Sequence, residues 1–339
     1  MNEPRVLRVG LVGAGWVTQH HLAAWAGEAA RAKVVAIADP AIDRARERAA
    51  AFGIEGVYAD AAEMFAGAQL DAVDIASPRE AHVEAVRLAA RHGVAALCQK
   101  PLAPTFEEAR ALVEEVAAMP RPIRLMVHEN WRFRPYYRQL GAWLRDGRIG
   151  RVTQAQMTLL SSGLVPDASG ALPALVRQPF VATLQRALVM EILIHHIDTL
   201  RFLLGEMRLV HSQLGRQSAA MRGEDRAALT FTANEQTTVT LLANLDVAGE
   251  PPALVDRLVV VGEAGTIRLD GDSLVCCGAQ PESLRYDLPQ SYLASYAGTI
   301  GHFLDRLADG VPFETSPADN LRTLRIVEDV YAAATSTAS

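Results

Sequence analysis

A glycine-rich turn near the N-terminus constrains the fold of this chain more than any other feature. The sequence VGLVGAGWVT places Gly13 and Gly15 between an apolar run and a helical pattern. Gly13 permits a tight turn, and Gly15 lets the backbone approach a phosphate closely. The N–H groups that follow, at Trp16 and Val17, favour an anion at the start of a helix. The segment predicts a dinucleotide-binding turn, with Thr18 in place of the third glycine of the motif.

An acidic residue, Asp39, ends the next apolar run, about 20 residues beyond the turn. A carboxylate at this point accepts hydrogen bonds from the adenosine ribose and repels a 2′-phosphate. Pro40 and Ala41 follow it, and neither could neutralise a phosphate. We therefore expect the cofactor to be NAD rather than NADP. The alternative is an ordinary turn at a strand end together with a surface acid.

The first 125 residues alternate apolar runs with helical patterns. The runs are rich in Val, Ile, Leu and Ala, which is typical of strands covered on both faces. Ser77 and Thr105 precede two helices with capping-box spacing, and Pro78 stands at a first helical position. This alternation predicts a Rossmann-type, doubly wound parallel sheet in residues 1–125. The expected strands are 6–12, 34–38, 72–76, 94–97 and 123–127, and the expected helices are 41–52, 79–91 and 106–118.

After residue 125 the pattern changes to consecutive strands with short connections, which indicate an antiparallel sheet. We assign residues 126–339 to a second α/β domain with an open, mainly antiparallel sheet, which binds substrate and mediates oligomerisation. Its C-terminal helices could pack back on the first domain. The exposed sheet face predicts a homodimer or homotetramer. The expected elements are helices at 135–146 and 184–204, a loop at 161–180, two C-terminal helices, and strands at 152–160, 209–214, 227–233, 237–245, 257–261 and 266–269.

The charge and cysteine content exclude several classes of protein. The net charge is −6 and no long basic run occurs, so we expect no nucleic-acid or membrane partner. The three cysteines form no disulfide framework and no CxxC pair, and no signal peptide or membrane-spanning run is evident. These features favour a cytoplasmic enzyme that acts on a small molecule.

A lysine follows the fifth expected strand, in the sequence Cys98-Gln99-Lys100-Pro101. Ligands of doubly wound sheets bind beyond the carboxyl ends of the strands, so Lys100 would point towards the site. Pro101 disfavours a helical conformation at Lys100 and holds it at the strand end. A Lys-Pro pair on its own is more often an ordinary loop.

Three polar residues share one face of the apolar helix at 184–204. Glu191, His195 and Asp198 have the spacing of neighbouring helical turns, whereas His196 points about 100° away. Polar groups on such a helix need partners or a function. They could form a structural network, an active-site group or a metal site. No HExxH spacing and no neighbouring cysteine occur, so we expect no metal.

These segments together resemble the glucose–fructose oxidoreductase, inositol dehydrogenase and MocA family over nearly the whole chain. The resemblance implies that Lys100 lies near the nicotinamide and the reacting hydroxyl, with Gln99 in place of the commoner Glu. It also implies that Ser77, Pro78 and His82, which match a (T/S)PxxxH stretch, pass under the cofactor.

Two further segments extend the resemblance into the second half. Asn130 and Arg132 match an NxRFxP stretch, where they would face the cofactor or the substrate. Glu191 and His195 match the acid and histidine of DxGxHxxD, with Glu for Asp and Leu193 for Gly. The implied reaction is hydride transfer between NAD and a carbinol carbon of a sugar or cyclitol. The similarity to members that oxidise aldoses implies oxidation at C1 to a lactone.

In this interpretation Lys100 and His195 exchange the hydroxyl proton, and Glu191 orients one of them. A free lysine is a poor base at neutral pH, and a free histidine is a better one, so the sequence leaves the carrier open. Two other functions are compatible with the same motifs. One is a catalytically silent NAD-binding sensor or scaffold, and the other is a reductase of the same fold that acts on a non-sugar imine or carbonyl.

Overall fold

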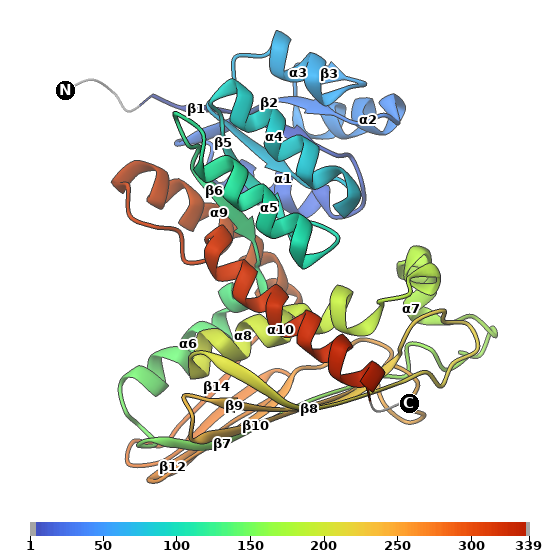
Figure 1. The fold of residues 1–339 in the computed structure, drawn as a ribbon, viewed down its shortest axis with the longest axis vertical. Coiled ribbons are helices and arrows are strands. Elements are labelled where there is room, and N and C mark those ends of the chain that lie inside the picture. Colours follow the sequence, from blue (N-terminus) through green and yellow to red (C-terminus); the bar gives the residue numbers. More distant parts are fainter. Residues whose placement is uncertain (1–4, 337–339) are drawn as a thin grey trace. The chain divides into compact units, whose positions relative to one another are not determined.

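The computed structural model describes residues 5–336, which divide into two compact units (Figure 1). The first unit contains residues 5–133 and Leu293–Leu324. The second unit contains residues 134–292 and 325–336. None of the described helices is long and apolar enough to cross a membrane.

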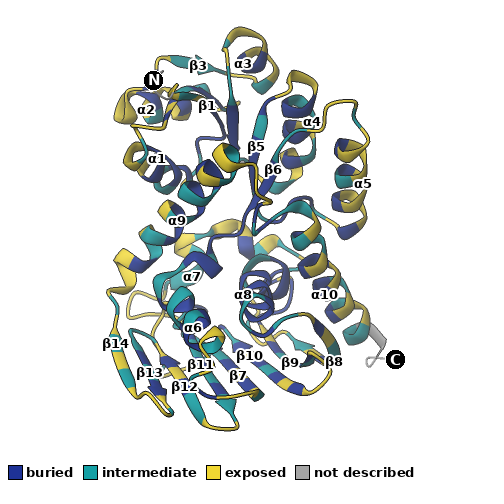
Figure 2. Ribbon diagram, turned by 90° about the vertical axis from the view of Figure 1, so that its left-hand side faces the viewer, coloured by how far each residue is buried: buried dark blue, intermediate teal, exposed yellow. Residues whose placement is uncertain are grey.

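The first unit is built on a sheet of six parallel strands in the order β3-β2-β1-β4-β5-β6. Helices α1, α2 and α9 cover one face, and α3, α4 and α5 cover the other (Figure 2). The strands are β1 (Leu7–Val12), β2 (Ala32–Ala38), β3 (Gly56–Tyr58), β4 (Ala72–Ile75), β5 (Ala95–Gln99) and β6 (Leu125–His128). The helices are α1 (Thr18–Gly27), α2 (Ile42–Phe52), α3 (Ala61–Gly67), α4 (His82–His92), α5 (Phe106–Ala117) and α9 (Leu288–Asp309).

The central strands of this sheet are covered on both faces, as their apolar composition predicts. Leu11, Ile75 and Leu97, in β1, β4 and β5, have no exposed surface. The Rossmann-type sheet predicted from the sequence is thereby confirmed. The pattern missed β3 and α3, because both are short and β3 lies at the edge of the sheet. Asp60 caps α3 by accepting hydrogen bonds from two amides of its first turn.

One of the two predicted helix caps forms. The Thr105 hydroxyl accepts a hydrogen bond from the Glu108 amide and so begins α5. The cap predicted at Ser77 is wrong. Pro78 is extended, with ψ 145°, and the chain enters a 3₁₀ turn at Arg79–Ala81 without a side-chain cap. The Ser77 hydroxyl is one residue too far back to reach the amides of that turn.

The second unit contains an eight-stranded sheet in the order β14-β13-β12-β11-β7-β10-β9-β8. Only β7 and β10 pair in parallel, so the predicted open and mainly antiparallel sheet is confirmed. The sequence did not predict the two short strands β13 and β14 at one side of the sheet, of which β14 is the edge strand. The strands are β7 (Val152–Leu160), β8 (Met207–Gly215), β9 (Arg226–Ala233), β10 (Thr237–Asn244), β11 (Arg257–Gly262), β12 (Gly265–Asp270), β13 (Ser273–Cys277) and β14 (Glu282–Arg285).

One face of this sheet is covered and the other is open. Helices α6 (Pro135–Arg145) and α8 (Ile194–Leu204) lie along the covered face (Figure 1). Burial alternates along the strands (Figure 2), so that Met157 of β7 is buried whereas its neighbour Gln156 is exposed. Leu242 of β10 is 44% exposed on the open face. No helix of residues 5–336 covers that face.

The single helix predicted at 184–204 is wrong in its first half. A 3₁₀ turn at Pro179–Thr183 and a π-helical segment at Leu188–Leu193 precede α8. Glu224 stabilises the start of this irregular segment, because its carboxylate accepts hydrogen bonds from the amides of Ala187 and Val189. The predicted loop at 161–180 also contains a short helix, α7 (Pro173–Arg177). The last helix, α10, spans Pro317–Ser336.

Candidate cofactor and active site

The glycine loop follows β1 at the edge where the carboxyl ends of the parallel strands meet. Gly13 has φ 108° and donates a hydrogen bond to the Ala38 carbonyl at 2.8 Å. A Cβ atom at Gly13 would lie 2.7 Å from the Ala76 carbonyl oxygen at the end of β4. The loop therefore packs directly on the β4 backbone, and only glycine satisfies both the dihedral and the contact.

Gly15 faces open space. A Cβ atom there would have no neighbour within 4 Å, and the Thr18 hydroxyl donates to the Gly15 carbonyl at 2.6 Å. Trp16 is 51% exposed beside this space, and its ring contacts His20 edge-on. The open space before the ten-residue helix α1 fits a pyrophosphate held by backbone N–H groups.

Asp39 lies directly beside the glycine loop. One carboxylate oxygen accepts a hydrogen bond from the Ala14 amide at 2.7 Å, and the other accepts from Ala41 at 2.8 Å. Each carboxylate oxygen has capacity for a further donor, so a ribose diol can still bind. The structure thus brings the predicted ribose acid and the phosphate loop together.

Arg48, a residue of α2, also reaches the glycine loop, and it was not predicted as a site residue. Its guanidinium lies 3.5 Å from the Gly15 carbonyl oxygen. The available signal was a basic residue in the helix that follows Asp39. The direction of its side chain, however, depends on how α2 packs. A cation at this point favours an anionic ligand in the loop.

His82 joins two predicted cofactor segments. Its Nδ1 lies 2.8 Å from the Pro101 carbonyl oxygen, and its Nε2 lies 2.9 Å from that of Ser77. Burial lowers the pKa of His82, although the contacts with the two carbonyl groups act in the opposite direction. The ring fixes the end of β4 against the chain that follows β5, where the Lys100–Pro101 peptide is cis.

Gln99 ends β5 at the same edge and Lys100 directly follows it, and both are half-buried. The Gln99 side-chain oxygen accepts a hydrogen bond from the Lys100 amide at 2.9 Å, and its nitrogen lies 3.1 Å from His21. Within the first unit the structure therefore gathers the glycine loop, Asp39, His82 and Lys100 on one edge of the sheet.

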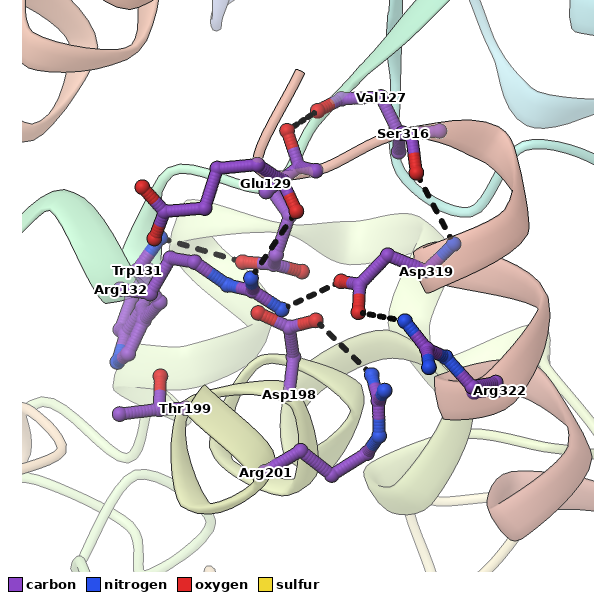
Figure 3. Close-up of polar contacts among 12 residues, drawn as sticks. Val127, Glu129, Trp131, Arg132, Asp198, Thr199, Arg201, Ser316, Asp319 and Arg322 are labelled. Atoms are coloured by element: carbon purple, nitrogen blue, oxygen red, sulfur yellow. Dashed lines mark hydrogen bonds and ion pairs between the residues drawn. The ribbon is translucent and has the colours of Figure 1, made fainter. Parts of the chain in front are cut away.

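Asn130 and Arg132 both have partners inside the first unit. The Asn130 amide donates to the Ser295 hydroxyl at 2.8 Å. Arg132 is 3% exposed and forms an ion pair with Asp319 at 2.8 Å, and Asp319 also binds Arg322 (Figure 3). These contacts engage part of the Arg132 guanidinium in a structural role, and its contact with substrate stays a prediction.

Glu191 and His195 belong to the second unit, on either side of the junction between the π-helical segment and α8. Glu191 is half-buried, whereas His195 is 8% exposed and its carbonyl accepts a hydrogen bond from Thr199. Asp198 lies 4.0 Å from Arg201 (Figure 3), which also binds Glu206 at 2.9 Å. These pairs favour the structural alternative for Asp198.

A buried polar cluster surrounds Asp256 and was not predicted from the sequence. Its carboxylate lies 3.0 Å from Arg134 and from the Tyr136 hydroxyl, and 3.1 Å from His196 Nε2. Burial opposes the charge, but Arg134 and His196 hold the pKa of Asp256 well below its usual range. His196 thus belongs to this cluster. Its members come from three separate parts of the sequence, at positions 134–136, 196 and 256. Residues 5–336 contain no group of three or more metal-binding side chains.

The first unit has the strand order and phosphate loop of a dinucleotide-binding oxidoreductase, with the loop at the point where the strand order reverses. Residues 7–127 match the oxidoreductase family described as having an NAD-binding Rossmann fold. Residues 137–268 match the GFO/IDH/MocA C-terminal domain. The chain therefore belongs to the GFO/IDH/MocA family of NAD-binding oxidoreductases, as its sequence motifs predict.

Named relatives and a solved structure agree with this assignment. The chain is 35% identical to a D-apiose dehydrogenase of Paraburkholderia graminis, over 96% of this chain and 86% of the relative. It is 32% identical to an inositol 2-dehydrogenase of Saccharopolyspora erythraea, over 79% and 75%. A crystal structure of an oxidoreductase from Agrobacterium radiobacter, in complex with NAD⁺, L-tartaric acid and magnesium, superposes with a TM-score of 0.88. It shares 30% identity over 98% of this chain and 97% of that one.

Proposed function

We propose that this protein oxidises an aldose at C1 to a lactone, with NAD as the hydride acceptor. The enzyme class predicted from the sequence, an NAD-dependent sugar or polyol dehydrogenase, is confirmed by the named relatives. The choice of an aldose over a cyclitol rests on the match to D-apiose dehydrogenase, which covers 96% of this chain, against 79% and 59% for two inositol 2-dehydrogenases.

The position of Lys100 is the observation that carries the proposal. Lys100 directly follows β5, on the edge that also holds the glycine loop and Asp39. When bound, NAD supplies a nicotinamide that accepts the hydride from the carbinol carbon. A lysine at this edge can bind the reacting hydroxyl and share its proton.

The second unit supplies the other proposed catalytic groups. We assign to His195 the exchange of the hydroxyl proton, because an imidazole carries protons readily near neutral pH. Glu191 orients or polarises one of the two proton-exchanging groups. Asn130 contributes an amide to cofactor or substrate, and Arg132 stabilises its own segment through Asp319.

A substrate panel tests the proposal. NADH formation is measured with D-apiose, other pentoses and hexoses, myo-inositol and a simple aliphatic alcohol, and products are identified by mass spectrometry and NMR. We expect turnover of an aldose to the lactone and very little turnover of the alcohol, since unpaired buried polar groups penalise a ligand without hydroxyls. A ring ketone as product would assign cyclitol chemistry instead. Failure with every aldose and cyclitol would favour the sensor or the imine and carbonyl reductase.

We further propose that the open sheet face of the second unit pairs with another copy of the chain. The exposed Leu242 lies on this face among threonine and valine side chains of half-buried character. Light scattering distinguishes a homodimer from a homotetramer, and Leu242→Asp should shift the mass towards the monomer. The cytoplasmic location, expected from the cysteine content, stays a prediction.

A further inference from the structure

A buried carboxyl group lies in β4, the strand that pairs with β5 ahead of Lys100. Asp74 of β4 has no exposed surface and accepts hydrogen bonds from His21 Nδ1 at 2.8 Å and Trp25 Nε1 at 2.7 Å. Trp25 Nε1 can only donate, so the Asp74 oxygen that both residues contact is an acceptor, and the contact with His21 places the proton on Nδ1.

The other nitrogen of His21 has a different partner. Nε2 lies 3.1 Å from the side-chain nitrogen of Gln99, and an amide nitrogen can only donate a hydrogen bond. Nε2 must therefore be unprotonated in order to accept. The two contacts together specify a neutral imidazole with its proton on Nδ1.

The orientation of the Gln99 amide is fixed by the same contacts. Its oxygen accepts a hydrogen bond from the Lys100 amide at 2.9 Å. A flipped amide would place its NH₂ group against the Lys100 N–H and its oxygen against the lone pair of His21 Nε2. Both contacts would become repulsive, so only one orientation is compatible with the network.

We propose that Asp74, His21 and Gln99 form a positioning relay for Lys100. The relay begins at the buried carboxyl group of Asp74, passes through one tautomer of His21 and ends on the backbone N–H of Lys100. The relay positions the backbone of Lys100. In this proposal neither His21 nor Asp74 contacts the cofactor or the substrate. The kinetic consequence rests on the proposed function, whereas the tautomer of His21 does not.

Several other groups face the His21 ring. The rings of His128 and Tyr296 have centroids 4.3 Å and 5.3 Å from that of His21. His20 is adjacent in sequence, and burial lowers its pKa. An experiment on His21 must therefore separate its signal from those of the neighbouring histidines.

Nitrogen NMR on the full-length protein labelled with ¹⁵N-histidine reads the tautomer directly. The signal of His21 is assigned by its loss in His21→Asn, and those of His20 and His128 by single glutamine variants. At neutral pH we expect a protonated Nδ1 and an unprotonated Nε2. In Gln99→Glu a carboxylate replaces the donor, so both nitrogens should become protonated. A wild-type His21 with a proton on Nε2 would overturn the proposal whether or not the Gln99→Glu variant folds.

Kinetics then test the positioning role. Gln99→Met keeps the length of the side chain and removes both hydrogen bonds. We expect kcat to fall about tenfold or more, as a small misplacement of a catalytic group does, with KM and the Kd for NAD within about twofold. Gln69→Met replaces an exposed glutamine outside the relay and should change kcat by less than about twofold. Equal losses of kcat in both variants would contradict a relay through Gln99. If no sugar is turned over, the proposed function fails and the NMR result still decides the relay.

Discussion

The carboxylate of Asp256 lies 3.0 Å from the guanidinium of Arg134, although 122 residues separate them in the sequence. Asp256 directly precedes β11 and Arg134 directly precedes α6, so the pair fixes a helix to the sheet of the second unit. His196 of α8 binds the other carboxylate oxygen and brings a second helix to the same point.

Asp256→Asn should lower the free energy of unfolding by about 3 kcal/mol at pH 7, since it leaves Arg134 buried without its counter-charge. Urea denaturation followed by circular dichroism measures the change. The matched control is Asp272→Asn, whose partner Arg285 is exposed, and it should cost less than about 0.5 kcal/mol. Similar losses in the two variants would contradict a special role of the cluster.

The stabilisation from Asp256 should depend on pH in a defined direction. Its pKa is lowered in the folded state, so its contribution is complete above the pKa of an unfolded aspartate, about 4, and declines as the pH falls below that value. The difference in unfolding free energy between wild type and Asp256→Asn should therefore narrow in acid. Denaturation curves from pH 7 to pH 3 test this, and a difference that widens in acid would be inconsistent with a lowered pKa.

Gly13→Ala and Gly15→Ala should separate folding from cofactor binding. Alanine at position 13 requires a positive φ and collides with the Ala76 carbonyl, so we expect a loss of about 2 kcal/mol in stability. Alanine at position 15 meets no protein atom and should leave the stability unchanged within about 0.5 kcal/mol. It should weaken NAD binding at least about tenfold, because its methyl group occupies the space of the pyrophosphate. Calorimetry with and without NAD measures both effects, and normal NAD affinity in Gly15→Ala would remove the phosphate site from this loop.

Asp39 should make the enzyme prefer NAD. A 2′-phosphate beside this carboxylate loses a hydrogen bond and is repelled, so the Kd for NADP should exceed that for NAD by about tenfold or more. Asp39→Ala should reduce this ratio, whereas Asp43→Ala, an exposed acid of α2, should not. Titration of intrinsic fluorescence gives the six dissociation constants that are needed, two for each of the three proteins. Tighter binding of NADP by the wild type would show that Arg48 rather than Asp39 decides the choice.

Lys100→Met and His195→Ala should each lower turnover at least about a hundredfold, the usual scale for a general acid or base. NAD affinity should stay within a few-fold, because the pyrophosphate site lies on the glycine loop. Lys33→Met and His211→Ala replace exposed residues of the same types and serve as controls. Near-normal turnover in either active-site variant would refute the role of that residue, and loss of NAD binding in both would indicate structural roles.

Local patterns predicted most of the fold of this chain. The covered strands of the first unit, the alternating strands of the second and the cap at Thr105 follow from short segments whose own residues determine their structure. The glycine loop and Asp39 were predictable because a ligand-binding turn needs particular residues at fixed spacing. The structure brings these two together through the Ala14 amide.

Interactions between distant segments were not predictable in the same way. The π-helical segment depends on Glu224, which lies more than 30 residues beyond it in the sequence. Arg48 reaches the glycine loop, and Asp256 gathers Arg134 and His196, only because of how whole elements pack. A single sequence contains no local signal for such partners. A polar residue in an apolar stretch indicates that it needs a hydrogen-bond or ion-pair partner, but it does not show which residue provides one.

The π-helical segment determines how substitutions elsewhere in the chain can alter the arrangement of Glu191 and His195. Tyr331 donates a hydrogen bond to Glu224 at 2.6 Å and accepts one from the Met190 amide at 3.2 Å, so two distant side chains hold the wide turn that carries Glu191. A regular α-helical turn would rotate Glu191 around the axis relative to His195. The angular phase between these two groups is therefore set by the loop of Glu224 and by the last helix. Substitutions in either place would change the direction of the Glu191 side chain without any change in the sequence of the helix.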